Sequence, residues 1–523
     1  MSPNPDAILI GAGHNSLACA CVLAARGWSV AVYEQASEPG GAVKSGAYTL
    51  PGFRHDWAAM NLSLFAGSPF HAEFGADLAQ HGLAFAPAAH PFASVFDDNS
   101  WLGVSHDVET TTARIRALSP EDAEVWAALT QDFPAQAETI FALLGSPMRR
   151  RDLARLGWTT WRGRGAGGML DLGRFLTMSP RAWLDEAFTH PHVKAMLAAW
   201  GMHLDFAPDI AGGALFPYLE GMAGQAFGMV LGQGGADTMV TAMASLIIAR
   251  GGSVTCDAPV ARILHQGGHA EGIELADGRR VRAKRAVIAN VAPAALDRLM
   301  GGSGDVNYDK GLQRFSHAPG TMMIHLAMDD LPDWRAGAAL RDFAYVHIAP
   351  SLEQMGRTYT QAKAGLLPDR PVIVCGQPTV VDPSRAPDGK HVLWLQVRMA
   401  PGQITGDAGG QIAASDWDAA AAPFADRALD ILEHYAPGTR DKIIGQRIVP
   451  PTELEADNPN LVGGDQICGS HHLSQHFMYR PQRGYADGST PIKGLYHTGA
   501  AVWPGAGTGA GPGYLLGKRL AGS

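Results

Sequence analysis

Cysteine is scarce in this chain, and its spacing excludes two kinds of stabilisation. Five cysteines occur in 523 residues, and no pair has the CxxC spacing of a zinc site or a redox-active dithiol. An odd, scattered set is typical of reduced thiols that are buried as small core residues in a cytosolic protein. The histidines within residues 471–476 also lack the spacing of metal ligands. We therefore expect a cytoplasmic protein with no disulfide framework and no metal site.

Long apolar runs and a basic surplus are also missing. No stretch of eighteen strongly apolar residues is present, and the uncharged residues 494–517 are too rich in glycine and proline for a spanning helix. The formal net charge of −9 offers no basic surface for nucleic acid, so no nucleic-acid partner is expected. The first strand is predicted to begin at Asp6 or Ala7, which leaves no room for a secretory signal. Attachment to a membrane surface stays open.

The remaining composition is that of a large folded protein. Hydrophobic residues make up 46% of the chain and charged residues 17%, which supports a sizeable core and argues against disorder. The length of 523 residues predicts two to four domains.

The strongest motif occupies residues 6–34, DAILIGAGHNSLACACVLAARGWSVAVYE. It reads as a short apolar strand, a tight glycine turn, a helix and a second strand that Glu34 closes. Gly11 allows the sharp turn, and Gly13 lets a pyrophosphate approach the free N–H groups at the helix start. Glu34 is expected to accept hydrogen bonds from ribose hydroxyls and would repel a 2′-phosphate. Ser16 replaces the third glycine of the fingerprint, which predicts a slightly wider gap between helix and strand.

A glycine pair after Glu34 favours FAD over NAD. Gly40 and Gly41 resemble the extended fingerprint of the glutathione-reductase-like FAD superfamily, in which such a pair passes close to the FAD pyrophosphate. Ala42 stands where many members have an arginine, so that phosphate contact is absent or supplied elsewhere. No second GxGxxG follows a strand, which argues against a separate NAD(P) domain. FAD is therefore the expected cofactor.

Three further segments resemble one family. Residues 47–57, YTLPGFRHDWA, resemble the segment that follows the glycine pair in phytoene-desaturase-like enzymes. Residues 228–250 resemble that family's Gly-Gly loop and the helix after it. Residues 480–517 contain TPIKGLYHTGA and PGAG, which are specific to the group. The chain thus resembles the FAD-dependent phytoene desaturases, a family that includes carotenoid desaturases and proteins of the pyridine nucleotide-disulphide oxidoreductase domain 2 type.

The resemblance implies an α/β protein with two parts. A Rossmann-like FAD-binding domain would be discontinuous, and an α+β substrate domain would contain a mainly antiparallel sheet. Strand-like segments within residues 320–348 and 371–399 support that sheet. The FAD-binding domain is expected to comprise residues 1–85, 215–300 and 441–523, and the substrate domain residues 86–214 and 301–440.

The resemblance also implies cofactor contacts outside the N-terminal fingerprint. Val260 would lend backbone atoms to the adenine. The segment from Gly499 to Gly507 would pass beside the isoalloxazine. Gly509 to Gly513 would open a helix whose N-terminus stabilises negative charge on the reduced flavin.

Three residues are candidates for catalytic roles. Trp503 stands where relatives often have histidine, and it is expected either to wall an apolar substrate pocket or to pack in the core. His55 and Asp56 fall near the expected edge of the cofactor, where they could relay protons, and a structural role is the alternative.

The function that the resemblance implies is redox chemistry on carbon. We expect an FAD-dependent oxidoreductase that dehydrogenates, reduces or isomerises C–C or C=C bonds of a small lipophilic, unsaturated substrate. One alternative is an amine oxidase-like flavoenzyme that uses oxygen.

Another alternative is a flavin-bearing protein that acts at a membrane surface. Residues 149–164 contain six arginines together with Trp158 and Trp161. Such a segment suits an anionic membrane surface, an oligomer contact or a solvated helix. Peripheral membrane contact and a homo-oligomer are therefore both left open.

Overall fold

The N-terminal fingerprint folds as the sequence predicted. Strand β1 (Ala7–Ile10) ends at the glycine turn, helix α1 (His14–Ala25) follows, and strand β2 (Val30–Tyr33) returns parallel to β1. Gly11 has a φ of +85°, a left-handed conformation that glycine adopts at little cost, and this makes the sharp turn feasible. The computed structural model describes residues 4–522.

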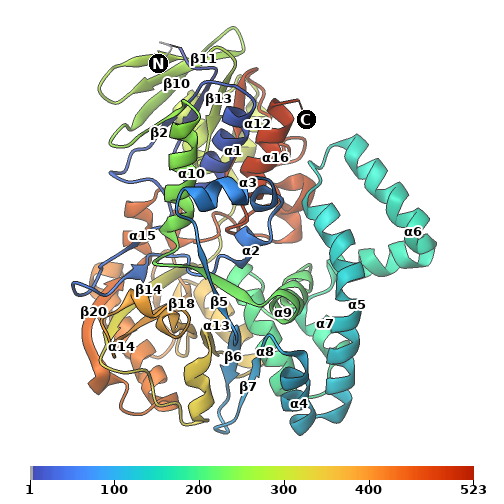
Figure 1. Cartoon of the computed structure of the whole chain (residues 1–523), viewed down its shortest axis with the longest axis vertical. Coiled ribbons are helices and arrows are strands. Elements are labelled where there is room, and N and C mark those ends of the chain that lie inside the picture. The colour runs from blue at the N-terminus through green and yellow to red at the C-terminus, as the bar shows by residue number, and fades with distance from the viewer. Residues whose placement is uncertain (1–3, 523) are drawn as a thin grey trace.

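This unit lies in a parallel sheet of five strands, with the order β21–β13–β1–β2–β9. The sheet occupies the upper part of the molecule in Figure 1. All residues of β1 and β13 are buried, as expected for parallel strands that are covered on both faces. The three strands not yet described are β9 (Ser253–Thr255), β13 (Ala286–Ala289) and β21 (Leu495–His497).

Helices cover one face of this sheet, and a small antiparallel sheet covers the other. Helix α16 packs directly on α1, because a Cβ at Gly513 would lie only 1.8 Å from the backbone oxygen of Asn15. On the opposite face, β10, β11 and α11 pack apolar side chains against β1 and β13. The helical layer consists of α1, α3 (Pro69–Gln80), α10 (Asp237–Ala249) and α16 (Gly511–Leu520). The second layer consists of β10 (Val260–Gln266), β11 (His269–Leu275), β12 (Arg280–Arg282), α11 (Pro293–Met300) and α12 (Val306–Gln313).

A seven-stranded sheet forms the lower part of the molecule (Figure 1). Its order is β20–β14–β18–β17–β15–β6–β7, and every neighbouring pair is antiparallel except β15 with β6. The predicted α/β class with a mainly antiparallel second sheet is confirmed. The strands are β6 (Phe92–Val95), β7 (Trp101–Val104), β14 (Gly320–Met328), β15 (Tyr345–Ile348), β17 (Val372–Gly376), β18 (His391–Ala400) and β20 (Ile443–Val449).

The two faces of this sheet differ in chemistry. On β18, Leu395 and Val397 point to an apolar face that packs against α14 (Trp417–Tyr435). Gln396 and Arg398 alternate with them and therefore point to the opposite face, toward the five-stranded sheet and the helices. Two polar side chains of β18 thus project into an inner face that otherwise packs apolar residues such as Val374 and Trp394.

Helices pack beside the seven-stranded sheet and carry an arm. Trp126 and Phe133 of α5 are fully buried in the shared core. Helix α6 buries no residue, and a φ of +69° at Gly165 interrupts it. Figure 1 shows α6 standing away from the body of the molecule. The helices are α4 (Val108–Leu118), α5 (Pro120–Leu144), α6 (Arg150–Thr177), α7 (Pro180–Ala187), α8 (Pro191–Gly201), α9 (Leu215–Phe227) and α13 (Leu352–Lys363).

The predicted domain segments stay a prediction, and two elements lie across them. Helix α12, from the expected substrate segment, packs in the core of the upper part. Strand β20, from the expected FAD segment, pairs with β14 of the lower sheet. Within residues 4–522, no helix is both long and apolar enough to cross a membrane. The remaining short elements are α2 (Ser63–Ala66), α15 (Pro451–Asp457), β3 (Ser45–Gly46), β4 (His55–Asp56), β5 (Phe85–Ala88), β8 (Met229–Gly232), β16 (Leu366–Leu367) and β19 (Gly406–Asp407).

Candidate flavin and substrate site

One large cavity joins the two sheets. Its volume is about 550 Å³, within the usual range for small-molecule and cofactor sites. Residues from the five-stranded sheet and its loops line one part, and residues from the seven-stranded sheet and its helices line the other. We call these parts the nucleotide end, which includes Gly11, Gly13, Glu34, Gly40, Gly41 and Val260, and the substrate end, which includes Trp200, His203, Glu220, Tyr345, Gln396 and Arg398.

The wall of the nucleotide end is built largely from backbone. Gly13 precedes the first turn of α1, and no side chain caps the N–H groups of that turn. The Gly40 N–H donates to the Ala12 carbonyl oxygen at 3.0 Å, which holds the glycine pair beside the turn. A Cβ at Gly41 would lie 3.5 Å from the Gly13 Cα, so the two glycine segments pass very close to each other. Such bare amides at a helix start are suited to a pyrophosphate.

Glu34 connects the turn to the ribose position. Its carboxylate accepts hydrogen bonds from the backbone N–H groups of Ala12, at 2.6 Å, and Ala36, at 2.9 Å. The side chain is buried, and it still lines the cavity together with Val260 from β10. Amide donors, a carboxylate and an adjacent backbone strand are the groups that an ADP moiety needs, so this end fits FAD.

Of the three glycines predicted in the C-terminal segment, one lies in the wall of the cavity. Gly507 lines the cavity, and its carbonyl oxygen lies 3.1 Å from His14 Nε2. Burial lowers the pKa of His14 to about 4, so this histidine is neutral at physiological pH. The segment is therefore attached to the start of α1 by an uncharged contact.

Three predicted cofactor residues lie behind the wall. A Cβ at Gly499 would lie 2.1 Å from the side-chain oxygen of Asn290, and one at Gly509 would lie 3.0 Å from the Leu64 carbonyl oxygen. These glycines make room for neighbours that line the cavity themselves. Ser16 is fully buried in α1, and neither it nor the other two is among the lining residues. Their direct contact with the cofactor stays a prediction.

Sequence reasoning missed several residues of the nucleotide end. Asn290 follows β13, and Arg298 lies on α11. Lys44 also lines this end, where Asp457 accepts its hydrogen bond at 2.6 Å. Asn290 was detectable in principle, because residues that follow parallel strands gather at the carboxyl edge of the sheet. Arg298 carries no motif that marks it.

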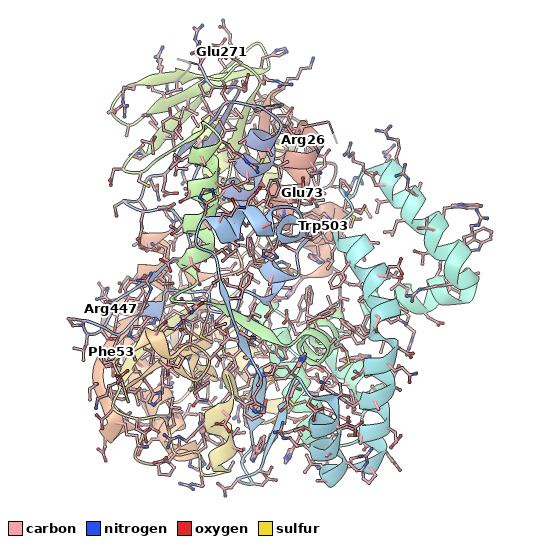
Figure 2. All side chains as sticks on the ribbon, viewed as in Figure 1. Arg26, Phe53, Glu73, Glu271, Arg447 and Trp503 are labelled. Carbon is pink, nitrogen blue, oxygen red and sulfur yellow. The ribbon has the colours of Figure 1, made fainter. Side chains whose placement is uncertain are left out.

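Trp503 lies outside the cavity wall. Its indole N–H donates to the Ser146 carbonyl oxygen at 2.7 Å, and its ring packs near His476 and Phe477. Figure 2 shows it between the C-terminal segment and the base of the α5–α6 arm. A catalytic role for Trp503 stays a prediction, and its surroundings are those of a packing residue.

His55 and Asp56 also lie outside the cavity wall. Asp56 is fully buried against the Arg385 guanidinium, and it accepts hydrogen bonds from Ser45 Oγ at 2.6 Å and from the Ala236 N–H at 2.8 Å. Burial and the nearby Arg385 lower the pKa of His55 to about 3, which leaves the imidazole neutral. The predicted proton relay stays a prediction, whereas the contacts are those of a buried network that connects β4 with the start of α10 and with the segment between β17 and β18.

Glu220 is the acidic residue of the substrate end. It projects from α9 into the cavity, and the rings of Trp200 and Tyr345 line the same space. Burial raises the pKa of Glu220 to about 7, so both protonation states are populated near neutral pH. A carboxyl group of this kind can accept or deliver a proton.

Two histidines contact each other at the substrate end. His203 Nε2 lies 3.2 Å from His347 Nε2, and His203 lines the cavity. Burial lowers the pKa of His347 to about 3 and that of His203 well below its usual range. Both imidazoles are therefore neutral, and they can share one proton through a hydrogen bond.

Comparison with known proteins supports this geometry. The family model of the NAD(P)-binding Rossmann-like domain matches residues 9–75, which contain the glycine turn, Glu34 and the glycine pair. A triple mutant of putrescine oxidase has a similar fold, with a TM-score of 0.61 and 15% identity over 99% of this chain and 98% of its own.

Curated relatives match along almost the whole chain. Pyridine nucleotide-disulfide oxidoreductase domain-containing protein 2 of Rattus norvegicus is 28% identical over 97% of this chain and 91% of its own length. A component of the limonene dehydrogenase of Castellaniella defragrans is 24% identical, over 99% and 94%. Phytoene desaturase (neurosporene-forming) of Cereibacter sphaeroides is also 24% identical, over 97% and 93%. These similarities confirm the predicted resemblance: the chain is an FAD-dependent oxidoreductase with a Rossmann-like FAD-binding fold, related to the phytoene desaturases and to the pyridine nucleotide-disulfide oxidoreductase domain 2 proteins.

Proposed function

We propose that the chain dehydrogenates a C–C bond of a small unsaturated substrate whose body is apolar. The observation that carries this proposal is that one cavity joins a wall suited to FAD to a pocket containing one titratable carboxyl group. The names of two relatives, limonene dehydrogenase and phytoene desaturase, support redox chemistry on unsaturated hydrocarbons.

The protein's own residues divide the work in this reaction. FAD, when bound, supplies the acceptor for a hydride from a substrate C–H bond. Forming the C=C bond also releases a proton from the neighbouring carbon, and the ionised Glu220 carboxylate is positioned to take it. Trp200 and Tyr345 orient a flat substrate and exclude water from that carboxylate.

Anaerobic reduction of the purified holoprotein tests the proposal. Unsaturated hydrocarbons and amines of matched size are mixed separately with the flavoprotein, and flavin absorbance and products are followed. We expect an unsaturated substrate to bleach the flavin and to yield a product lacking two hydrogens, as measured by mass spectrometry. Bleaching by amines alone would reject the proposal.

Amine oxidation is the second candidate function. The observation that favours it is that the Glu220 carboxyl group lines the same cavity as the rings of Trp200 and Tyr345, a combination that also suits an ammonium group. The fold shared with putrescine oxidase is consistent with it. Amine-dependent formation of hydrogen peroxide under air would support this candidate, and its absence across the amine panel would reject it.

A peripheral membrane contact is proposed for α6. Trp158 and Trp161 are 57% and 45% exposed, with their rings 5.0 Å apart. Arg151, Arg155 and Arg162 lie on the same helix, which gives this face a positive charge complementary to anionic lipids. Vesicles of mixed anionic and neutral lipid should sediment the protein at low salt, and the Trp158→Ser, Trp161→Ser double variant should stay in solution. Equal sedimentation of both proteins would reject the contact.

A further inference from the structure

Arg398 is a buried cation in the substrate end of the cavity. It projects from β18 on the inner face of the seven-stranded sheet, is 5% exposed and lines the cavity. Burial lowers its pKa to about 10, which still leaves the guanidinium positively charged at neutral pH. A full charge is therefore held in a site that is largely shielded from water.

The protein surrounds this cation with neutral acceptors. Its Nη2 donates to the His203 carbonyl oxygen at 2.7 Å, and its Nη1 donates to Thr321 Oγ1 at 3.0 Å. The Nη1 atom also lies 3.4 Å from Gln466 Oε1. Among residues 4–522, no carboxylate lies within ion-pair distance of the guanidinium, and its Nε–H has no hydrogen-bond acceptor. The nearest carboxylates that influence it, Asp205 and Asp465, act from a greater distance.

Other buried arginines in the chain are satisfied in ways that Arg398 is not. Arg385 pairs with Asp56 and Asp382, and Arg427 pairs with Asp407. Arg480 has no carboxylate partner, but backbone carbonyl oxygens accept from all its donor nitrogens, and it lies outside the cavity wall. A buried cation with an unused donor beside a cavity is costly unless an anion joins it.

We infer that Arg398 forms a subsite for an anionic group of the substrate, with a carboxylate as the chemical class. This inference rests on the proposed function, and it divides the substrate into an unsaturated apolar body and an acidic terminus. The apolar side chains of Trp200 and Leu204 line the same end and accommodate the body. The acidic terminus would lie beside Arg398, Gln396 and the neutral His203.

The subsite predicts a preference for acids over their amides. Holoprotein is titrated with sorbate, cinnamate and decanoate, and with the corresponding amides, by calorimetry. Since hydrogen bonds to charged groups are stronger than neutral ones, we expect at least one acid to bind at least about tenfold more tightly than its amide. If every acid and amide pair binds with equal affinity, or no acid binds, the inference is wrong.

Two variants assign the preference to Arg398. Arg398→Gln removes the charge. Gln466→Glu places an isosteric carboxylate next to the guanidinium and should occupy it as an internal counter-ion, and it retains the oxygen that Gln396 Nε2 contacts at 2.8 Å. Both variants should lose the preference for acids. Gln466→Glu should also keep or raise the melting temperature, so a failure of Arg398→Gln to fold would leave the test intact.

A matched control and a cofactor measurement complete the design. Arg447→Gln removes an exposed arginine on the outer strand β20, labelled in Figure 2, and should keep the preference for acids. The dissociation constant for FAD is measured in every variant. If Arg398→Gln weakens FAD binding while the acid preference persists, Arg398 faces the cofactor and the inference is wrong. Failure of the proposed function has a different signature, in which acids still bind selectively but no unsaturated compound reduces the flavin.

Discussion

The two ends of the cavity differ in what forms their walls: backbone atoms form the nucleotide end, and side chains form the substrate end. At the nucleotide end, backbone amides and the absence of side chains at Gly13 and Gly41 make the wall. At the substrate end, long side chains such as those of Glu220 and Arg398 project from α9 and β18. Backbone geometry needs particular glycines in a particular order, whereas a side-chain wall accepts many residue types. The first end therefore follows a motif that the family model of the Rossmann-like domain matches, and we expect the second end to determine which substrate this chain binds.

The largest effect is expected at Gly13. Its φ of −68° is one that any residue adopts, and a Cβ there would lie 3.0 Å from the Asn290 side-chain nitrogen, a contact that a small shift of Asn290 relieves. Gly13→Val should therefore fold, but the added side chain would block the approach to the α1 amides. We expect the purified variant to contain almost no FAD, a loss in affinity of more than about 100-fold. Cofactor content is measured by the absorbance ratio of flavin to protein.

The control for this change is another glycine with open space. A Cβ at Gly173 of α6 meets no atom within 4 Å, so Gly173→Ala should keep its flavin. If Gly13→Val retains bound FAD and a normal spectrum, the nucleotide end is not the backbone wall described above.

At the substrate end, Glu220→Gln should reduce turnover and leave cofactor binding unchanged. Removing a general base lowers kcat by about 100-fold or more. The folded-state pKa of about 7 is raised above its usual value, so the carboxylate needed as a base appears as pH rises through 7. The kcat of the wild type should therefore increase as the pH rises through 7, and the kcat of the variant should show no such increase. A surface control, Glu121→Gln, should keep both the rate and the pH profile.

The raised pKa of Glu220 also predicts how the stability of the protein depends on pH. Because folding raises the pKa of Glu220, the folded state binds more protons than the unfolded state between pH 4.5 and 7. The free energy of unfolding should therefore fall across this window in the wild type, relative to Glu220→Gln. Urea titrations at pH 5, 6, 7 and 8 measure the difference, and parallel curves for the two proteins would contradict the raised pKa.

The contrast between the two ends also explains which site residues could be predicted from the sequence and which could not. Gly11, Gly13, Glu34 and the glycine pair lie within 31 residues of each other and have fixed local tasks, so the motif alone located them. Arg398 and Glu220 come together only through the register of a sheet and the packing of a helix. One signal was present, since Gln396 and Arg398 alternate with apolar residues at the end of β18, which indicates that this part of one face is polar. Strand alternation shows that a face is polar, but it does not show that a cavity lies against it.

Trp503 shows that a sequence motif can place a segment without predicting the direction of each side chain in it. Its segment does approach the cavity, because Gly507 lines the wall. Four residues earlier, however, the indole of Trp503 points toward Ser146, in the segment that joins the C-terminal end of α5 to α6. The position of the segment was predictable from order along the chain, whereas the direction of one side chain depended on the helical arm, for which the sequence has no motif.

Glu34 is the side chain on which the nucleotide end most depends, and its effect should be smaller than that of Gly13. In Glu34→Gln, the amide group must face one of the two backbone N–H donors, Ala12 or Ala36, and so one hydrogen bond is lost. We expect FAD affinity to fall about tenfold, with a modest decrease in melting temperature. Glu38→Gln, an exposed acid that lines the same end, is the matched control and should bind FAD normally. Equal affinity of both variants would mean that the carboxylate of Glu34 contributes nothing specific.

The smallest effect on FAD binding is expected from replacing Arg298, whose side chain lines the nucleotide end beside the backbone wall. It lies on α11 at the edge of the nucleotide end and is exposed, so water and salt screen its attraction to a phosphate. Arg298→Gln should weaken FAD binding by only about twofold to fivefold at low salt, and the difference from wild type should vanish as ionic strength rises. Arg314→Gln, an exposed arginine on the neighbouring helix segment that does not line the cavity, should show no such salt dependence. A loss as large as that of Gly13→Val would mean that side-chain charge, and not bare backbone, is what holds the cofactor at this end.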